Sequence, residues 1–142
     1  MDIPDNVLVV GRAEAIDIPA LGLWKVPAKI DTGAYGCSVH CFSAQTRRLA
    51  DGKEILDVQV YQSTPSVIFD EFEKHVVKSS NGDSEERFAV KIVVKLGKKR
   101  VRTLVSFADR EDMRYSVLIG RKFLRGRFWV DVSRKFVLTT AV

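Results

Sequence analysis

Hydrophobic and polar residues alternate along much of the chain, a pattern typical of β-strands with one buried face. The alternation is most regular in segment 87–96, whose hydrophobic positions are Phe88, Val90, Ile92, Val94 and Leu96. Shorter segments that predict strands lie at 7–10, 16–18, 24–30, 39–42, 55–61, 101–107, 117–119, 128–132 and 136–140. One short helix is expected at 121–125, where Gly126 would end it.

Turn signals separate these segments. The dipeptide Asn81-Gly82 is the strongest of them, because both residues readily take the positive φ angles of a tight hairpin turn. A hairpin is therefore expected over about residues 75–96. Segment 62–74 contains Thr64-Pro65 and little periodicity, so a loop-like excursion is expected there.

Many short strands with a single short helix predict an all-β barrel or sandwich. The length of 142 residues fits one domain spanning residues 1–142, with enough surface to bury for a core. A hydrophobic content of 46% and a mean hydropathy of −0.03 are those of a folded chain. Two cysteines exclude a disulfide scaffold, and the absence of a leader-like start or a long apolar run predicts a soluble cytoplasmic protein without a membrane partner.

The charge is unevenly distributed over the chain. Residues 1–71 carry 6 Lys and Arg against 10 Asp and Glu, whereas residues 72–142 carry 17 against 8. The net charges are therefore −4 and +9, and the basic half favours polyanionic partners by long-range attraction. The alternative is an ordinary solvated basic face.

The residues with the clearest chemical potential follow the predicted strand 24–30. Asp31-Thr32-Gly33 places a carboxylate at a strand end, next to a glycine whose N–H another oxygen can approach. Taken alone, this tripeptide also fits a turn in which the aspartate accepts a hydrogen bond from its own backbone.

The wider context of this tripeptide carries a resemblance. The sequence Ala-Lys-Ile-Asp-Thr-Gly-Ala at 28–34 and the late Val-Leu-Ile-Gly-Arg-Lys-Phe-Leu at 117–124 resemble the paired motifs of retropepsin-like aspartic peptidases. More closely, the chain resembles the bacterial and archaeal family described as ATP-dependent zinc proteases, which includes the peptidase associated with the RimK glutamate ligase. The further segments that carry this resemblance are 10–14, 18–22, 38–40 and 125–131.

The resemblance implies a retropepsin-like closed β-barrel or sandwich with one short C-terminal helix. It also implies a homodimer whose two Asp31 carboxyls meet and activate one water, with Thr32 and Gly33 fixing their geometry. The residues that would border the substrate are Ala34, Tyr35, Asn81, Gly82 and Arg121. Among them, Asn81 and Gly82 belong to the hairpin that would cover the site.

The chain departs from the family pattern at two places. Tyr35-Gly36 stands where the family usually has Arg-Thr, which alters the rim of the site. The presumed flap around Asn81-Gly82 is polar rather than glycine-rich, so its closure can differ from that of viral relatives.

The resemblance to the RimK-associated peptidase implies an acidic substrate, such as a glutamate-tailed peptide or protein, and a functional link to such a ligase. The basic second half suits acidic chains. The arginines that could hold their carboxylates are Arg87, Arg102, Arg114 and Arg121.

A zinc ion, which the family description suggests, would need ligands that the sequence hardly offers. The best local set is Cys37, His40 and Cys41, but alternation on a strand would turn His40 and Cys41 to opposite sides. The other interpretation is that both cysteines are small apolar residues facing one side with Val39. No cofactor is therefore expected, and without a phosphate-binding loop ATP binding is not expected.

Two other functions remain open from the sequence. The same fold could serve as a catalytically inactive module that binds a peptide or a protein, with the Asp31 loop in a purely structural role. A basic β-barrel that binds nucleic acid is disfavoured, because the basic runs lack interleaved aromatic residues for base stacking.

Overall fold

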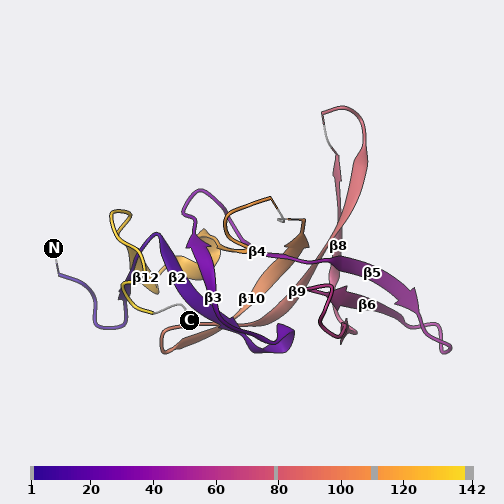
Figure 1. Cartoon of the computed structure of the whole chain (residues 1–142), viewed down its shortest axis with the longest axis horizontal. Coiled ribbons are helices and arrows are strands. Elements are labelled where there is room, and N and C mark those ends of the chain that lie inside the picture. Colours follow the sequence, from indigo (N-terminus) through magenta and orange to yellow (C-terminus); the bar gives the residue numbers. More distant parts are fainter. Residues whose placement is uncertain (1, 79, 110–111, 140–142) are drawn as a thin grey trace.

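The computed structural model describes residues 2–78, 80–109 and 112–139. Strands dominate the described chain (Figure 1). They are β1 (Leu8–Val10), β2 (Ala13–Ile18), β3 (Leu23–Ile30), β4 (Cys37–His40), β5 (Ser43–Arg48), β6 (Glu54–Gln59), β7 (Val67–Phe69), β8 (Glu73–Lys78), β9 (Ser84–Leu96), β10 (Lys99–Ala108), β11 (Val117–Ile119) and β12 (Phe128–Val130). The short helices are the 3-10 turn η1 (Pro19–Leu21) and α1 (Arg121–Leu124).

Six strands close into a barrel. The large sheet has the order β10-β4-β11-β3-β2-β9-β8, and a further pairing between β10 and β9 joins its ends, leaving β8 as a branch. Most neighbours are antiparallel, but β3 with β11 and β4 with β10 are parallel. The expected all-β closed barrel with one short α-helix near the C-terminus is confirmed.

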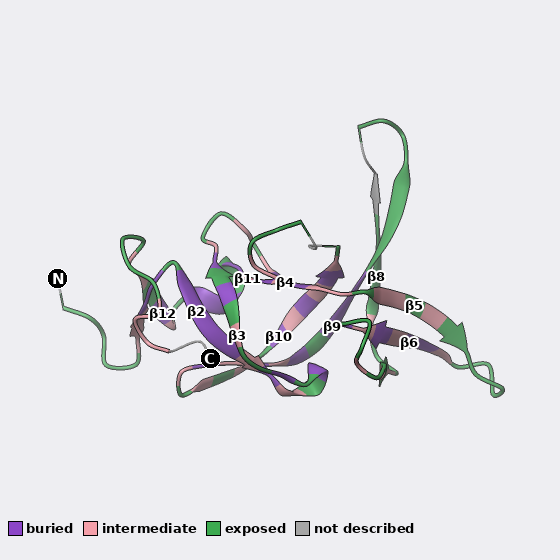
Figure 2. Ribbon diagram, viewed as in Figure 1, coloured by how far each residue is buried: buried purple, intermediate pink, exposed green. Residues whose placement is uncertain are grey.

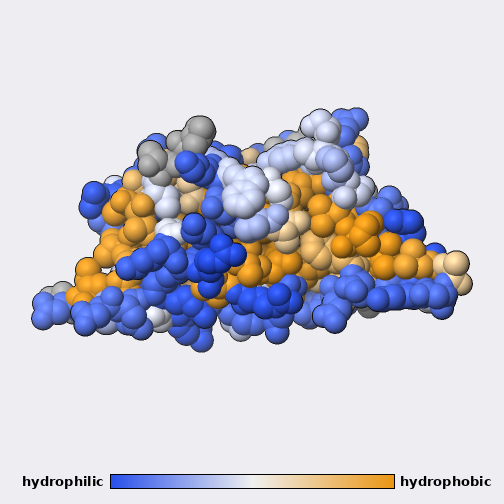
Figure 3. All heavy atoms as spheres, turned by 90° about the horizontal axis from the view of Figure 1, so that it is seen from below, coloured by the Kyte–Doolittle hydropathy of each residue, from blue (hydrophilic) through white to orange (hydrophobic). Residues whose placement is uncertain are grey.

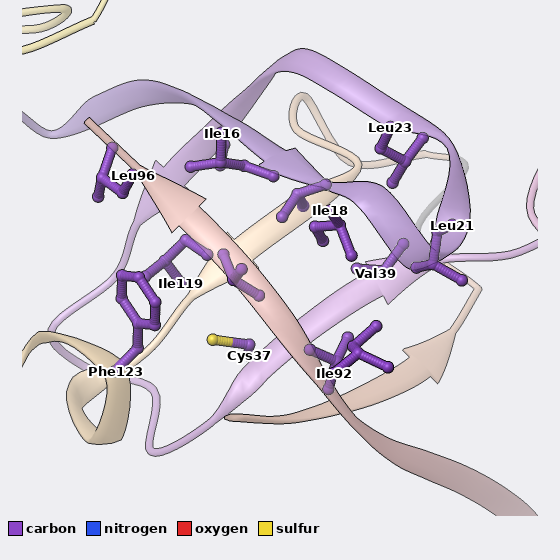
Figure 4. Close-up of a cluster of buried hydrophobic side chains, with 14 of the residues drawn as sticks. Ile16, Ile18, Leu21, Leu23, Cys37, Val39, Ile92, Leu96, Ile119 and Phe123 are labelled. Carbon is purple, nitrogen blue, oxygen red and sulfur yellow. The ribbon is translucent and has the colours of Figure 1, made fainter. Parts of the chain in front are cut away.

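The barrel interior is filled by the hydrophobic positions that alternate along the strands (Figure 4). All five hydrophobic positions predicted on one face of segment 87–96 are buried. Cys37 and Val39 point into the same interior from β4, and Phe123 closes it from α1. This packing fixes the register of β4, which follows the loop after β3, and the position of α1, which lies beside that loop.

Three parts of the chain differ from the sequence-based expectation. Segment 43–48, with few hydrophobic residues, forms β5 by pairing with β6. The expected excursion at 62–74 contains β7, which pairs with the other side of β6. The strand expected at 136–140 is absent over the described residues 136–139, where the chain bends at 136–138, and residue 140 lies outside the described chain.

Glu14 explains why residues 137–139 do not form a strand. Its carboxylate is fully buried in β2 and accepts backbone hydrogen bonds from Val137, Leu138 and Thr139 at 2.9–3.3 Å. It also accepts the Thr139 hydroxyl at 2.8 Å and the Gly11 N–H at 2.7 Å. A buried carboxylate thus replaces a neighbouring strand as the acceptor for these amides.

The hairpin of β8 and β9 projects from the barrel. Residues 73–76 of β8 and the outer part of β9 are exposed, whereas the inner half of β9 is buried in the barrel wall (Figure 2). The hairpin projects on the same side of the molecule as the loop that follows β3, the upper side in Figure 1.

The lower side of the molecule shows hydrophobic residues in a band between hydrophilic margins (Figure 3). Apolar atoms make up much of the surface of any folded protein, so we infer no partner from this band. Among the described residues, no helix is long and apolar enough to cross a membrane.

Candidate functional site

The candidate site is the loop of residues 31–36, which connects β3 to β4. Its ends are held by backbone hydrogen bonds: the Asp31 N–H donates to the Ile119 carbonyl at 2.8 Å, and the Arg121 and Lys122 N–H groups donate to Ala34 and Tyr35 carbonyls at 2.8 and 2.9 Å. The loop is therefore fixed between β11 and the start of α1. This explains why the two motifs, far apart in sequence, form one unit.

The Asp31 carboxylate is held in place and accessible. Its Oδ1 accepts the Gly33 N–H at 2.9 Å, and its Oδ2 lies 3.9 Å from the Lys29 ammonium nitrogen. The Asp31 side chain is 25% exposed. A carboxylate that is positioned by the backbone and still open to solvent can accept a proton from a bound molecule or donate one to it.

Gly120 makes the closest backbone approach in the site. A Cβ atom built on Gly120 would lie 2.3 Å from the Gly36 carbonyl oxygen and 2.8 Å from two further Gly36 backbone atoms. Only a residue without a Cβ lets α1 approach the loop in this way. A Cβ on Gly36 meets nothing within 4 Å, so the contact requires glycine at position 120 but not at position 36.

We predict that Gly120→Ala lowers the free energy of unfolding by about 1–3 kcal/mol, the usual cost of an overpacked contact, and displaces the 31–36 loop. The matched variant Gly36→Ala, at the other side of the same contact, should stay close to the wild-type stability. Chemical denaturation of both variants checks this. Equal stability of the two variants would contradict the packing argument.

Arg121 and Tyr35 form the rim of the loop. The Arg121 guanidinium donates to the Thr32 carbonyl at 3.0 Å and lies 5.9 Å from the centre of the Tyr35 ring. The Lys122 ammonium lies 6.0 Å from the same ring, and Tyr35 is 60% exposed. Tyr35 thus attracts cations to the rim through the face of its ring.

Two hollows adjoin the loop. One, of about 350 Å³, is lined by Lys29, Asp31, Met113, Arg114, Tyr115 and Leu118. The other, of about 250 Å³, is mostly apolar and is lined by Thr32, Arg121, Leu124, Arg125, Phe128 and Val130. The first hollow thus contains the carboxylate, and the second lies beside the exposed Thr32.

The structure brings some of the expected site residues together and leaves others apart. Asp31, Thr32, Gly33, Ala34 and Tyr35 share the loop, and Arg121 binds it. The turn residues Asn81 and Gly82 stand at the exposed tip of the projecting hairpin, away from the loop within a single chain (Figure 1).

The four candidate arginines also lie in different places. Arg114 lines the hollow that contains Asp31, and Arg121 lies on the rim. Arg87 is on the hairpin, 3.8 Å from Glu85, and Arg102 is exposed on β10 outside both hollows.

The proposed zinc ligands do not form a site. Cys37 is buried in the core, and burial raises its thiol pKa despite a backbone hydrogen bond from Gly120. Burial, together with nearby Asp109, raises the pKa of Cys41 to about 11, so its thiol stays protonated near neutrality. Cys41 packs against the core that contains Cys37 and Val39, and both His40 and Cys41 border a hollow next to β4.

Within residues 2–78, 80–109 and 112–139, no three His, Cys, Asp or Glu side chains come together as metal ligands. A resident zinc ion therefore does not fit the described residues. We derive no chemical step through one.

Lys29, Met113 and Leu118 were not among the residues expected at the site. The sequence could have predicted that Lys29 lies near Asp31. Residues two apart on a strand share a face, and Asp31 comes two positions after Lys29. Met113 and Leu118 reach the hollow from the segment before β11 and from β11 itself, a placement that depends on the pairing of β11 with β3.

Comparisons with known proteins agree with this fold. The model of the RimB-like family, described as retropepsin-like aspartic endopeptidase RimB, matches residues 9–141. A probable alpha-L-glutamate ligase of Shewanella pealeana is 30% identical over 139 residues, which are 94% of this chain and 30% of that protein. Another from Desulfotalea psychrophila is 29% identical over 136 residues, 92% of this chain and 29% of that protein. The chain thus spans under a third of the length of these relatives.

A solved structure has the same fold. The crystal structure of Lpg0085, a protein with unknown function (DUF785) from Legionella pneumophila, has a TM-score of 0.70 and 26% sequence identity. The match covers 92% of this chain and 98% of that chain.

Proposed function

Because the chain belongs to the RimB-like family of retropepsin-like aspartic endopeptidases, we propose that two copies of it form a peptidase that hydrolyses peptide bonds. Family membership confirms the resemblance seen in the sequence. The observation that carries the proposal is the single Asp31 carboxylate, positioned by the Gly33 N–H and open to solvent at the end of β3. One such carboxylate per chain requires a second copy to complete the catalytic pair.

In the proposed reaction the two Asp31 carboxyls of the dimer share one proton, since like charges so close together cannot both ionise easily. The ionised carboxylate takes a proton from a water molecule, whose oxygen attacks the scissile carbonyl carbon. The protonated carboxyl donates its proton to the carbonyl oxygen. The C–N bond of the tetrahedral intermediate then breaks, and the proton held by the first carboxyl passes to the departing amine. As the carbonyl re-forms, one hydroxyl of the intermediate returns its proton to the second carboxyl, which restores the pair that shares one proton.

The surface proposed for the second copy is the apolar hollow beside Thr32. Leu124, Phe128 and Val130 line it, and Trp129 and Val132 are exposed hydrophobic residues of the same region of the chain. Because Thr32 is next to Asp31, two copies that meet here around a twofold axis bring the two Asp31 side chains together. The projecting β8–β9 hairpin, with Asn81 and Gly82 at its tip, would then cover the bound peptide.

For the substrate we propose an acidic peptide, such as a glutamate-tailed protein, and a functional link to a RimK-type glutamate ligase. Two facts support this. The relatives that match the chain are named probable alpha-L-glutamate ligases, and the second half of the chain carries a net charge of +9.

The proposal is tested by hydrolysis of glutamate-rich and neutral peptides at increasing protein concentration. We expect turnover per chain to rise with concentration and then level off, in parallel with dimer formation measured by sedimentation. A chelator should leave turnover unchanged, because no step uses a metal. Turnover by a strictly monomeric protein, or loss of turnover with chelator and its restoration by zinc, would contradict the proposed mechanism.

A further inference from the structure

The hollow that contains Asp31 has a composition that selects for one kind of side chain. Its lining combines two cations, Lys29 and Arg114, with apolar surface from Met113, Leu118 and the Tyr115 ring. Asp31 is the only carboxylate among the residues that line it. The hollow therefore carries an excess of positive charge at one place and an apolar wall beside it.

Both cations have donors left for a ligand. The Lys29 ammonium is 3.9 Å from Asp31, beyond a hydrogen bond, and the Lys29 side chain is 53% exposed. The Arg114 guanidinium carbon lies 5.7 Å from the centre of the Tyr115 ring. A guanidinium over a ring keeps its N–H edge available, and this edge matches a carboxylate with two parallel hydrogen bonds.

The position of the hollow relates it to the scissile bond. A peptide whose reacting carbonyl lies at Asp31 must place an adjacent side chain close to Asp31, and Asp31 is itself part of the lining of the hollow. We propose that this hollow is the subsite for an acidic side chain next to the scissile bond, with Lys29 and Arg114 as its specificity-determining residues. The inference rests on the proposed peptidase function and deepens it.

Glutamate fits both parts of the hollow. Its carboxylate would be held between Lys29 and Arg114, and its two methylene groups would lie against Met113 and Leu118. Glutamine would keep the apolar contact but lose the charge-assisted hydrogen bonds, which are about twice as strong as neutral ones. The hollow would thus distinguish glutamate from glutamine, which have nearly equal shapes, by charge alone.

The test measures binding in the Asp31→Asn protein, so that it does not depend on turnover. The probes are short α-linked oligoglutamate and oligoglutamine peptides of equal length, titrated by calorimetry. We expect Arg114→Gln and Lys29→Gln each to raise the Kd for oligoglutamate about tenfold or more, as for the loss of a charge-assisted hydrogen bond. The Kd for oligoglutamine should change little.

Arg102→Gln is the matched control. It removes the same unit charge from an exposed position on β10, outside the hollow. An equal loss of oligoglutamate binding in Arg102→Gln would show attraction by overall charge and overturn the subsite. Oligoglutamate binding that does not respond to the two hollow variants would overturn it as well, provided that thermal unfolding shows both variants to be folded.

The outcomes separate the subsite from the peptidase function. If wild-type protein hydrolyses peptides through Asp31 but the Kd for oligoglutamate does not change in the Lys29 and Arg114 variants, the proposed subsite is wrong and the proposed function stands. If wild-type protein hydrolyses no peptide but both variants weaken oligoglutamate binding selectively, the hollow is an acidic-side-chain site on a module without peptidase activity.

Discussion

Asp31→Asn should abolish peptide hydrolysis while leaving the fold and the dimer intact. The amide oxygen of asparagine can accept the Gly33 N–H as Oδ1 of Asp31 does at 2.9 Å, so the loop keeps its geometry. An amide cannot take a proton from water at neutral pH. We expect kcat to fall by about a thousandfold, within the range for loss of a positioned general acid or base. The measurement is single-substrate kinetics with an oligoglutamate peptide.

Two controls sharpen this result. Asp70→Asn removes an exposed carboxylate whose salt bridge to Lys53 has a length of 3.4 Å, and it should retain wild-type turnover. Mixing wild-type protein with an excess of Asp31→Asn should depress turnover beyond simple dilution, because each mixed dimer holds only one carboxyl. Additive activities in the mixture, or normal turnover by Asp31→Asn alone, would refute the paired-carboxylate mechanism.

Glu14→Gln should destabilise the fold strongly, although it changes only one side-chain oxygen to an NH₂ group. The Glu14 carboxylate accepts the N–H groups of Gly11, Val137, Leu138 and Thr139 and the Thr139 hydroxyl. Glutamine turns its NH₂ group, itself a donor, toward some of these donors. With at least two charge-assisted hydrogen bonds lost in a fully buried position, the free energy of unfolding should fall by about 3 kcal/mol.

Denaturant unfolding followed by circular dichroism measures this effect. The matched control is Glu86→Gln, which makes the same chemical change at an exposed position of β9 and should be nearly neutral. Amide hydrogen exchange should show in addition that residues 137–139 lose protection first in Glu14→Gln. A loss of stability no greater than that of Glu86→Gln would mean that the carboxylate does not hold this segment.

The parts of the fold that could be predicted from sequence are those with local periodicity. The buried face of β9 is predictable because its hydrophobic residues recur at every second position, and the alternation is kept in the barrel. β5 escapes prediction because its pairing with β6, rather than its own hydrophobicity, makes it a strand. Residues 136–139 resemble a strand in composition, but the amides of 137–139 bind Glu14, more than a hundred positions earlier. No local pattern encodes such a partner.

The candidate site likewise has parts that could be predicted from local sequence and parts that could not. Asp31 and its loop can be predicted as a motif, because the motif is local and its second half at 117–124 is equally regular. The position of Lys29 next to Asp31 can also be predicted, because residues two apart on a strand lie on the same face. The wall formed by Met113 and Leu118 cannot, since it depends on how the segment before β11 lies after β11 pairs with β3.

The loop after β3 is held almost entirely by main-chain atoms: the amides of Asp31, Arg121 and Lys122, the carbonyls that they reach, and the close approach of Gly120 to Gly36. The side chains of Ala34 and Tyr35 have no part in those bonds. A substitution at either position can therefore change what the rim selects while the acid group stays in place. Tyr35, whose ring lies near the Arg121 and Lys122 cations, is such a position.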